Sequence, residues 1–365
     1  YMVFLISYAL TMPLVGGLID KYGPRIITLI GGLVFSGSWI LSSQVSSVGM
    51  LTITYGIVGG IGVGIVYGAP MAVTAKWYPK KKGAFVGLTL AGFGLSPFIT
   101  APVSKFLIEN YSLFKAFKIL GFVFLGLVVL LALFLRFPEP GEVKEVAQKT
   151  EKNSQKDLSL SKVLKNSRFY VLWVTFVIGT FSGLIAIGIS SPVAQEMIGI
   201  NATMSSFAVA LFAIFNGLGR PFFGWLTDKF QFKNTALISF SLIVVASLLM
   251  FGASKGSMII YLIAFCLFWF LFGGWLAIAP TAVAQIFGAK NYARNYGVLF
   301  TAYGAGALIG SLVSGLIKDS FGTYHYVFYS TAIAACIGLF IVLLTFRNQK
   351  KTVYTKEEKC SYENA

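Results

Sequence analysis

The stretch Pro13–Tyr22 reads PLVGGLIDKY and Pro221–Phe230 reads PFFGWLTDKF, so the two match without a gap at an offset of 208 residues. A second pair of matching stretches, which begin at Pro70 and Pro280, has an offset of 210. Two matches at nearly one offset indicate a duplicated unit. The chain is therefore predicted to contain two similar halves.

The composition is that of a membrane protein. The hydrophobic fraction is 56%, the charged fraction is 12% and the mean hydropathy is +0.79, whereas about a quarter of the residues of a soluble domain are charged. Apolar stretches of the ~20 residues that a bilayer core requires recur along the chain. We predict an all-α polytopic fold with eleven spans, near residues 1–19, 26–46, 50–75, 84–106, 113–136, 169–193, 203–227, 234–253, 257–286, 295–317 and 324–347.

The polar stretch 137–168, rich in Lys, Glu, Gln and Ser, divides the chain after the fifth span. We interpret it as a linker between an N-terminal half, 1–136, and a C-terminal six-helix half, 169–347, with a tail at 348–365. Tyr1 corresponds to Val209, which lies inside the second span of its half. The first helix of the N-terminal half is therefore expected to be absent from the sequence, and the intact fold to have two six-helix halves.

The positive charges are distributed unevenly between the two ends of the spans. With alternating spans, 23 of the 29 Lys and Arg residues fall on one side, five on the other, and the remaining one is Arg220. The positive-inside rule then places the linker and the C-terminus in the cytoplasm of a plasma-membrane protein. This asymmetry accounts for the net charge of +16 without nucleic acid. Cys266, Cys336 and Cys360 imply no disulfide framework.

Arg220 is the charged residue that cannot be placed at a helix end. It precedes Asp228 by eight residues, which is about 12 Å along a helix and well inside the bilayer. Buried guanidinium groups usually face a cavity and mark a substrate pathway. Its repeat counterpart, Met12, is uncharged, so the fold does not require the charge. The alternative is a structural pair with a carboxylate; none of the 13 acidic residues is predicted at that depth, and the absent helix leaves this alternative open.

The stretch Gly16–Arg25, GGLIDKYGPR, resembles the signature loop between the second and third helices of the major facilitator superfamily. The copy around Asp228 is degenerate, with Gln231 at the later glycine position. The resemblance implies that this loop takes part in conformational gating as the halves rock. The candidate gating residues are Gly16, Asp20, Lys21, Gly23, Arg25, Asp228 and Lys229.

Within that superfamily, the chain resembles the oxalate/formate antiporters and the related monocarboxylate transporters. The resemblance rests on Tyr55–Pro70, Trp77–Gly83, Phe215–Asp228 and Asn295–Gly304. It implies that Arg220 binds a substrate carboxylate, for which the planar guanidinium is suited. The family fold also places several aromatic side chains around the cavity, and the candidate substrate-binding residues are Arg220, Tyr303, Asn216, Tyr67, Trp275 and Phe272.

Two departures from these families bear on the cargo. Oxalate/formate antiporters have a lysine where this chain has Tyr303, so the predicted cavity contains one cation, Arg220. A single cation matches a monoanion such as lactate, pyruvate or formate better than it matches the dianion oxalate. Monocarboxylate transporters have an aspartate where this chain has Asn216, which cannot titrate. Exchange or uniport is therefore favoured over proton symport, although a titratable group on the absent helix would reopen proton coupling.

We expect a transporter of small carboxylate anions that works by alternating access. The alternatives are an oxalate/formate antiporter and a transport-inactive carboxylate receptor. An enzyme is not expected, because the chain has no Walker loop, metal-ligand cluster or nucleophile constellation. We expect no cofactor and no metal. The expected partners are the carboxylate substrate and the lipid bilayer, with no nucleic acid, and the protein is expected to be monomeric.

Overall fold

The computed structural model describes residues 2–79, 81–139, 142, 157–288 and 291–345. These residues form helices and connecting turns, with no strand among them, which confirms the all-α prediction. The predicted tail and most of the predicted linker, including 143–156, lie outside the described residues, as does Cys360. The domain boundaries at 136/137, 168/169 and 347/348 stay predictions.

The first half begins with α1, which carries the first copy of the repeated stretch. Its helices are α1 (Met2–Tyr22), α2 (Pro24–Ser42), α3 (Val48–Leu51), the π-helical segment η1 (Thr52–Gly59), α4 (Gly60–Trp77), α5 (Lys82–Asn110) and α6 (Leu113–Ala132). Ser112 is the N-cap of α6 because its hydroxyl accepts a hydrogen bond from the Lys115 amide.

The second half begins after the short helix α8 (Leu160–Leu164). It consists of α9 (Ser167–Pro192), the π-helical segment η3 (Val193–Ile198), α10 (Ala202–Phe251), α11 (Met258–Phe287), α12 (Tyr292–Leu299), α13 (Thr301–Phe321) and α14 (Val327–Thr345). Asn166 and Asn201 cap α9 and α10 through their side-chain oxygens.

Ten helical segments of the described chain are long and apolar enough to cross a membrane, where the sequence predicted eleven spans. The difference lies in α10, whose 50 residues would extend about 75 Å. Its helical geometry is interrupted at Gln231, with φ 62° and ψ 168°. The two parts of α10 therefore correspond to the two predicted spans 203–227 and 234–253.

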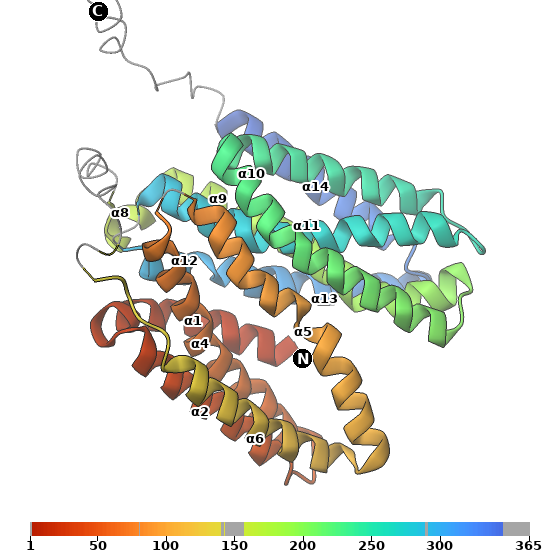
Figure 1. Ribbon diagram of the computed structural model, residues 1–365. Coiled ribbons are helices and arrows are strands. Elements are labelled where there is room, and N and C mark those ends of the chain that lie inside the picture. Colours follow the sequence, from red (N-terminus) through yellow and green to blue (C-terminus); the bar gives the residue numbers. More distant parts are fainter. Residues whose placement is uncertain (1, 80, 140–141, 143–156, 289–290, 346–365) are drawn as a thin grey trace, which may run out of the picture.

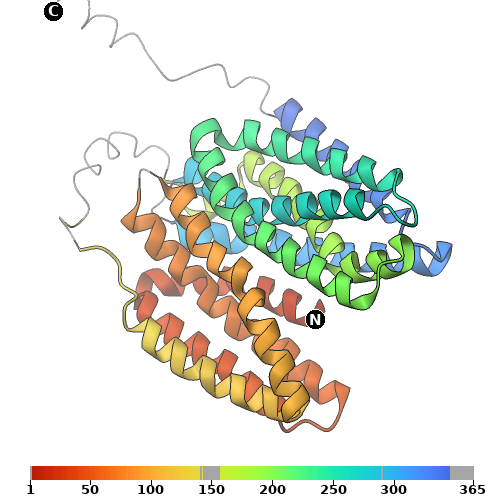
Figure 2. The same ribbon diagram turned by 45° about the vertical axis from the view of Figure 1, so that its right-hand side comes forward.

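The two halves lie side by side, with the helices of 2–132 below and those of 167–345 above in Figure 1. The helices of the two halves converge at the end where α8 lies, and they diverge at the opposite end (Figures 1 and 2). We call the first end the linker end and the other the open end. Asp20 and Asp228 lie at the linker end, near the ends of their spans.

The described end of the linker is fastened to the second half. The Leu158 amide donates to the Phe287 carbonyl oxygen, and the Leu158 carbonyl oxygen accepts from the side-chain amides of Asn291 and Asn295. Val163 of α8 is fully buried. Residues 158–163 therefore connect the linker to α11 and α12 at the linker end.

Candidate substrate-binding site

Arg220 lies in the first part of α10 and is only 2% exposed. Its Nη1 donates to the Leu90 carbonyl oxygen of α5 at 2.9 Å. Its Nε and Nη2 both donate to the Asn216 side-chain oxygen, at 3.4 and 3.2 Å. Asn216 lies one helical turn before Arg220 and is a neutral acceptor for one edge of the guanidinium. The second acceptor, the Leu90 carbonyl oxygen, belongs to the other half of the protein.

No carboxylate pairs with Arg220 among the described residues. The salt bridges of that part of the chain join Lys76 to Asp20, Lys105 to Glu109, Arg136 to Glu142 and Lys318 to Glu196, and all of these lie at helix ends or in connecting segments. Three of the five guanidinium N–H groups are used by Asn216 and Leu90. One N–H on Nη1 and one on Nη2 are not used by these hydrogen bonds.

Glycines of α5 allow α10 to come close enough for these contacts. A Cβ at Gly87 would collide with the Arg220 carbonyl oxygen, and a Cβ at Gly94 would lie 2.9 Å from Asn216 Oδ1 and 3.0 Å from Arg220 Nε. Between them, the Phe93 ring lies against the guanidinium, with Arg220 Cζ 5.3 Å from its centroid, within the range of a cation–π contact.

A group of four aromatic side chains adjoins Arg220 and is drawn from both halves. The Tyr8 ring lies 5.3 Å from Tyr67, 4.8 Å from Phe300 and 5.8 Å from Tyr303, centroid to centroid. Tyr303 stacks on Phe300 at 4.8 Å. Tyr67 interacts electrostatically with Arg220, and its ring lies 5.5 Å from Phe93. We call Tyr8, Tyr67, Phe300 and Tyr303 the aromatic group.

The structure brings most of the candidate residues together. Asn216 and Tyr67 lie next to Arg220, Tyr303 belongs to the aromatic group, and Phe272 reaches the edge of that group, 6.3 Å from Tyr303. Trp275 is different, because its fully buried ring packs on Gly179 and on Phe240 inside the second half. We therefore leave Trp275 out of the proposed site.

Sequence reasoning missed Tyr8, Phe93, Leu90 and Phe300. The repeat contained a signal for them. The offset of 208 maps Asn216 onto Tyr8, and the offset of 210 maps Phe300 onto Leu90 and Tyr303 onto Phe93. The contacts between the halves therefore follow the repeat. Arg220 contacts Leu90 of α5, and Tyr8, the counterpart of Asn216, contacts Phe300 and Tyr303, the counterparts of Leu90 and Phe93.

The gating candidates lie at the linker end. Asp228 accepts hydrogen bonds from the backbone amides of Gly83 at 3.0 Å and Ala84 at 2.9 Å, in the first turn of α5, where a helix terminus favours negative charge. Its counterpart Asp20 instead pairs with Lys76 of its own half at 3.2 Å. Gly23 has φ 81°, and Arg25, Lys21 and Lys229 are exposed.

Backbone contacts between small residues also close the linker end. A Cβ at Gly16 would collide with the Ala293 carbonyl oxygen, and one at Gly224 would collide with that of Gly83. The offsets map Gly16 onto Gly224 and Gly83 onto Ala293. The two contacts are therefore related by the internal repeat. The contacts of Gly87 with Arg220 and of Gly297 with Met12 are related in the same way.

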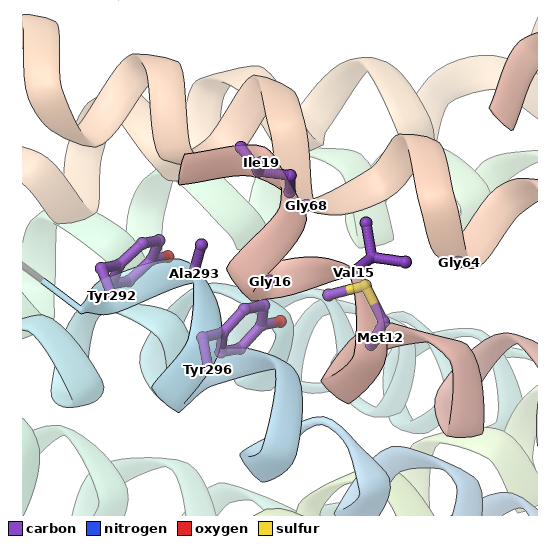
Figure 3. Close-up of a pocket in the computed structure, with 9 residues that line it drawn as sticks. All are labelled: Met12, Val15, Gly16, Ile19, Gly64, Gly68, Tyr292, Ala293 and Tyr296. Carbon is purple, nitrogen blue, oxygen red and sulfur yellow. The ribbon is translucent and has the colours of Figure 1, made fainter. Parts of the chain in front are cut away.

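A small cavity of about 10 Å³ lies beside these contacts, between α1, α4 and α12 (Figure 3). Met12, Val15, Gly16 and Ile19 line it from α1, Gly64 and Gly68 from α4, and Tyr292, Ala293 and Tyr296 from α12. The space is close to the minimum that one water molecule requires.

Comparison with known proteins decides the family. The family model described as Major Facilitator Superfamily matches residues 1–277 and 172–361. The chain belongs to the major facilitator superfamily. It is an integral membrane transporter, and the superfamily predicted from Gly16–Arg25 is confirmed.

Among the relatives of this superfamily member, the oxalate:formate antiporter of Oxalobacter formigenes is 31% identical over 94% of this chain and 82% of its own length. Monocarboxylate transporter 12 of Homo sapiens is 26% identical over 82% of this chain and 63% of its own length. The predicted relationship to both kinds of transporter is thereby confirmed.

Solved structures of the superfamily share this fold. The proton:xylose symporter XylE matches 95% of this chain and 85% of its own, with a TM-score of 0.75 and 15% identity. The human organic anion transporter MFSD10 matches 93% and 82%, with a TM-score of 0.70 and 15% identity. These likenesses establish the fold.

Proposed function

We propose that this transporter carries small monocarboxylate anions, such as formate, lactate or pyruvate, and that Arg220 binds the carboxylate. The observation that carries the proposal is a buried guanidinium between the two halves with no carboxylate partner among the described residues. A buried cation needs a counter-charge, because transfer of an unpaired charge out of water is costly. The anionic cargo supplies it.

The hydrogen bonds of Arg220 support a two-point contact with the cargo. Asn216 occupies the Nε and Nη2 edge, and Leu90 takes one N–H of Nη1. One N–H of Nη1 and one N–H of Nη2 bond to neither Asn216 nor Leu90. Together they match the two oxygens of a carboxylate, which accepts parallel hydrogen bonds from such a fork. The aromatic group beside them suits the small apolar remainder of the cargo.

The converging linker end and the diverging open end support alternating access. Arg220 contacts Leu90 of the other half, so movement of the halves changes the surroundings of the bound anion directly. We propose that the linker end faces the cytoplasm, from the excess of Lys and Arg there, and that the structure represents the protein with the cytoplasmic side closed.

The site supports transport of a monoanion by exchange or uniport. The oxalate:formate antiporter of Oxalobacter formigenes, the relative at 31% identity, makes oxalate the second candidate cargo. Against oxalate, Tyr303 contributes a phenol where a second cation would be needed for a dianion. Against proton symport, the neutral Asn216 is the side chain that contacts Arg220 in its own helix.

Transport into proteoliposomes tests the role of Arg220. Arg220→Lys keeps the charge and removes the planar fork. Uptake of labelled formate or lactate should fall at least tenfold, because the free energy of one or two hydrogen bonds to a charged group is lost. Arg168→Lys is the matched control, because Arg168 is exposed at the start of α9. Unchanged uptake by a folded Arg220→Lys protein would overturn the proposal.

Competition among cargoes tests the choice of a monoanion. Unlabelled formate, lactate and pyruvate should inhibit uptake by the wild type more strongly than oxalate does. Tyr303→Lys adds a second cation and should raise oxalate uptake. Stronger inhibition by oxalate in the wild type would instead establish the second candidate. Carboxylate binding without flux would identify a receptor.

A further inference from the structure

Two tyrosines of α12 bury hydroxyl groups that have no hydrogen-bond partner among the described residues. Tyr292 is 5% exposed and Tyr296 is 1% exposed, and both hydroxyl oxygens are unpartnered. Their rings lie one helical turn apart and stack nearly parallel, at 5.9 Å and 6°. A buried hydroxyl without a partner costs free energy, so the closed linker end holds both groups in an unfavourable state.

Both side chains face α1 of the other half. They line the small cavity between α1, α4 and α12, and in Figure 3 the Tyr296 hydroxyl lies toward Met12 of α1. Its volume of about 10 Å³ excludes a carboxylate from the closed form. The cavity therefore lies at a contact that must separate before the linker end can open.

The two phenols continue the Arg220 site toward the linker end. The Tyr296 ring lies 5.7 Å from Phe300 of the aromatic group, and the Tyr292 ring lies 5.9 Å beyond the Tyr296 ring on the next turn of α12. Tyr292 also lies in the seam where Ala75 and Lys82 of the first half meet Pro280 and Thr281 of the second. Tyr296 and Tyr292 are thus two successive hydrogen-bond donors that lead from the aromatic group toward the linker end.

We propose that Tyr296 and Tyr292 form a second carboxylate-binding station, which receives the anion from Arg220 when α1 separates from α12 at the linker end. A phenol hydroxyl donates a hydrogen bond to a carboxylate oxygen, and the separation exposes two such donors. The anion leaves Arg220 step by step, because each phenol hydroxyl replaces one of the hydrogen bonds that the guanidinium donated.

The position of the station gives a directional prediction, which rests on the proposed function. The station is accessible from the linker end, so loss of its hydroxyls lowers the apparent affinity for cargo presented at that end. Affinity for cargo presented at the open end depends on Arg220 and the aromatic group and stays the same. A general disturbance of Arg220 would instead weaken both.

The test uses the full chain in inverted and right-side-out membrane vesicles, with labelled formate and lactate as probes. In Tyr296→Phe, and more strongly in the Tyr292→Phe/Tyr296→Phe double variant, the half-saturating concentration should rise about tenfold at the linker end, as for a lost hydrogen bond to a charged group. At the open end it should change less than twofold. Tyr170→Phe is the matched control, because the exposed Tyr170 lies at the linker end on α9 and its hydroxyl bonds to the Leu164 carbonyl oxygen.

Thermal unfolding of each variant shows whether it folds. The double variant should unfold at the wild-type temperature or above it, because phenylalanine keeps the ring and removes an unpartnered hydroxyl. Unchanged half-saturation at the linker end, or an equal rise at both ends, would overturn the proposed station. If the wild type carries neither anion from either side, the proposed function itself fails, and the station fails with it.

Discussion

The Asp228 carboxylate and the Gly83 amide form a hydrogen bond of 3.0 Å that joins the second half to the first turn of α5 in the first half. The adjacent Ala84 amide donates to the other carboxylate oxygen at 2.9 Å. One side chain thus satisfies two of the amides that a helix N-terminus leaves without intrahelical partners. We expect this contact between the two halves to stabilise the form that is closed at the linker end.

Asp228→Asn should shift the protein toward the form that is open at the linker end. The amide keeps one acceptor and loses the charge, which removes roughly 1.5–3 kcal/mol from the closed form and changes the population about tenfold or more. Electron–electron distance measurements between spin labels at Tyr22 and Asn234, both exposed at the linker end, would detect a longer distance.

Asp20→Asn is the control for that measurement, because Asp20 pairs with Lys76 within one half. It should leave the distance between the labels as it is in the wild type. An equal lengthening in both variants would show that Asp228 has no special part in closure.

Gln231→Gly should stabilise the protein. The backbone of Gln231, at φ 62° and ψ 168°, occupies a region that is nearly restricted to glycine and costs other residues about 1–3 kcal/mol. After the entropy cost of glycine, a gain of about 1 kcal/mol remains. Thermal unfolding in detergent would show a rise of roughly 1–3 °C. Gln231→Ala keeps the Cβ and should give no such rise; equal stabilisation by alanine would rule out the strain.

Gly94→Ala should weaken carboxylate binding without changing any charge. The new Cβ would lie 2.9 Å from Asn216 Oδ1 and 3.0 Å from Arg220 Nε, so the hydrogen bonds that orient the guanidinium must shift. We expect the half-saturating formate concentration to rise about tenfold, because oriented hydrogen bonds to a charged group contribute 1.5 kcal/mol or more. Gly92→Ala is the control on the same helix, with nothing within 4 Å of its Cβ. Equal uptake by the two variants would contradict this role of Gly94.

Asn216→Asp should abolish uptake at neutral pH. The carboxylate introduced at position 216 would form a salt bridge with Arg220, so the guanidinium would no longer be available to bind the carboxylate of the cargo. Protonation neutralises that carboxylate, so uptake should recover as the pH falls, while wild-type uptake shows no such recovery. The pH profiles of formate uptake by the two proteins provide the measurement. Full uptake at neutral pH would argue against the anion as the counter-charge of Arg220.

The sequence was sufficient for the fold and for the depth of Arg220. Continuous apolar spans and a gapless repeat can be recognised in a single sequence, and the signature stretch Gly16–Arg25 indicated the superfamily. The boundary between the spans 203–227 and 234–253 was also predicted from the sequence, although Gln231 stands where the first copy has Gly23. Only the backbone shows that Gln231 keeps a positive φ, 62° against 81° at Gly23.

The surroundings of Arg220 were harder to predict. Trp275 and Tyr67 are both aromatic residues of apolar spans, and only the helix rotations show that Trp275 faces Phe240 while Tyr67 faces Arg220. Tyr292 and Tyr296 carry no pattern that separates them from the other tyrosines. Their unpartnered hydroxyls are a property of the packed structure.

The paired glycine contacts at the linker end, Gly16 with Ala293 and Gly224 with Gly83, have a kinetic consequence. Where backbone lies against backbone, no side chain is interlocked with another, so these surfaces separate without rotamer changes. The barrier to opening is then set by a few hydrogen bonds such as those of Asp228. Bulkier residues at these positions would alter how many transport cycles the protein completes per second, apart from how tightly Arg220 holds the anion.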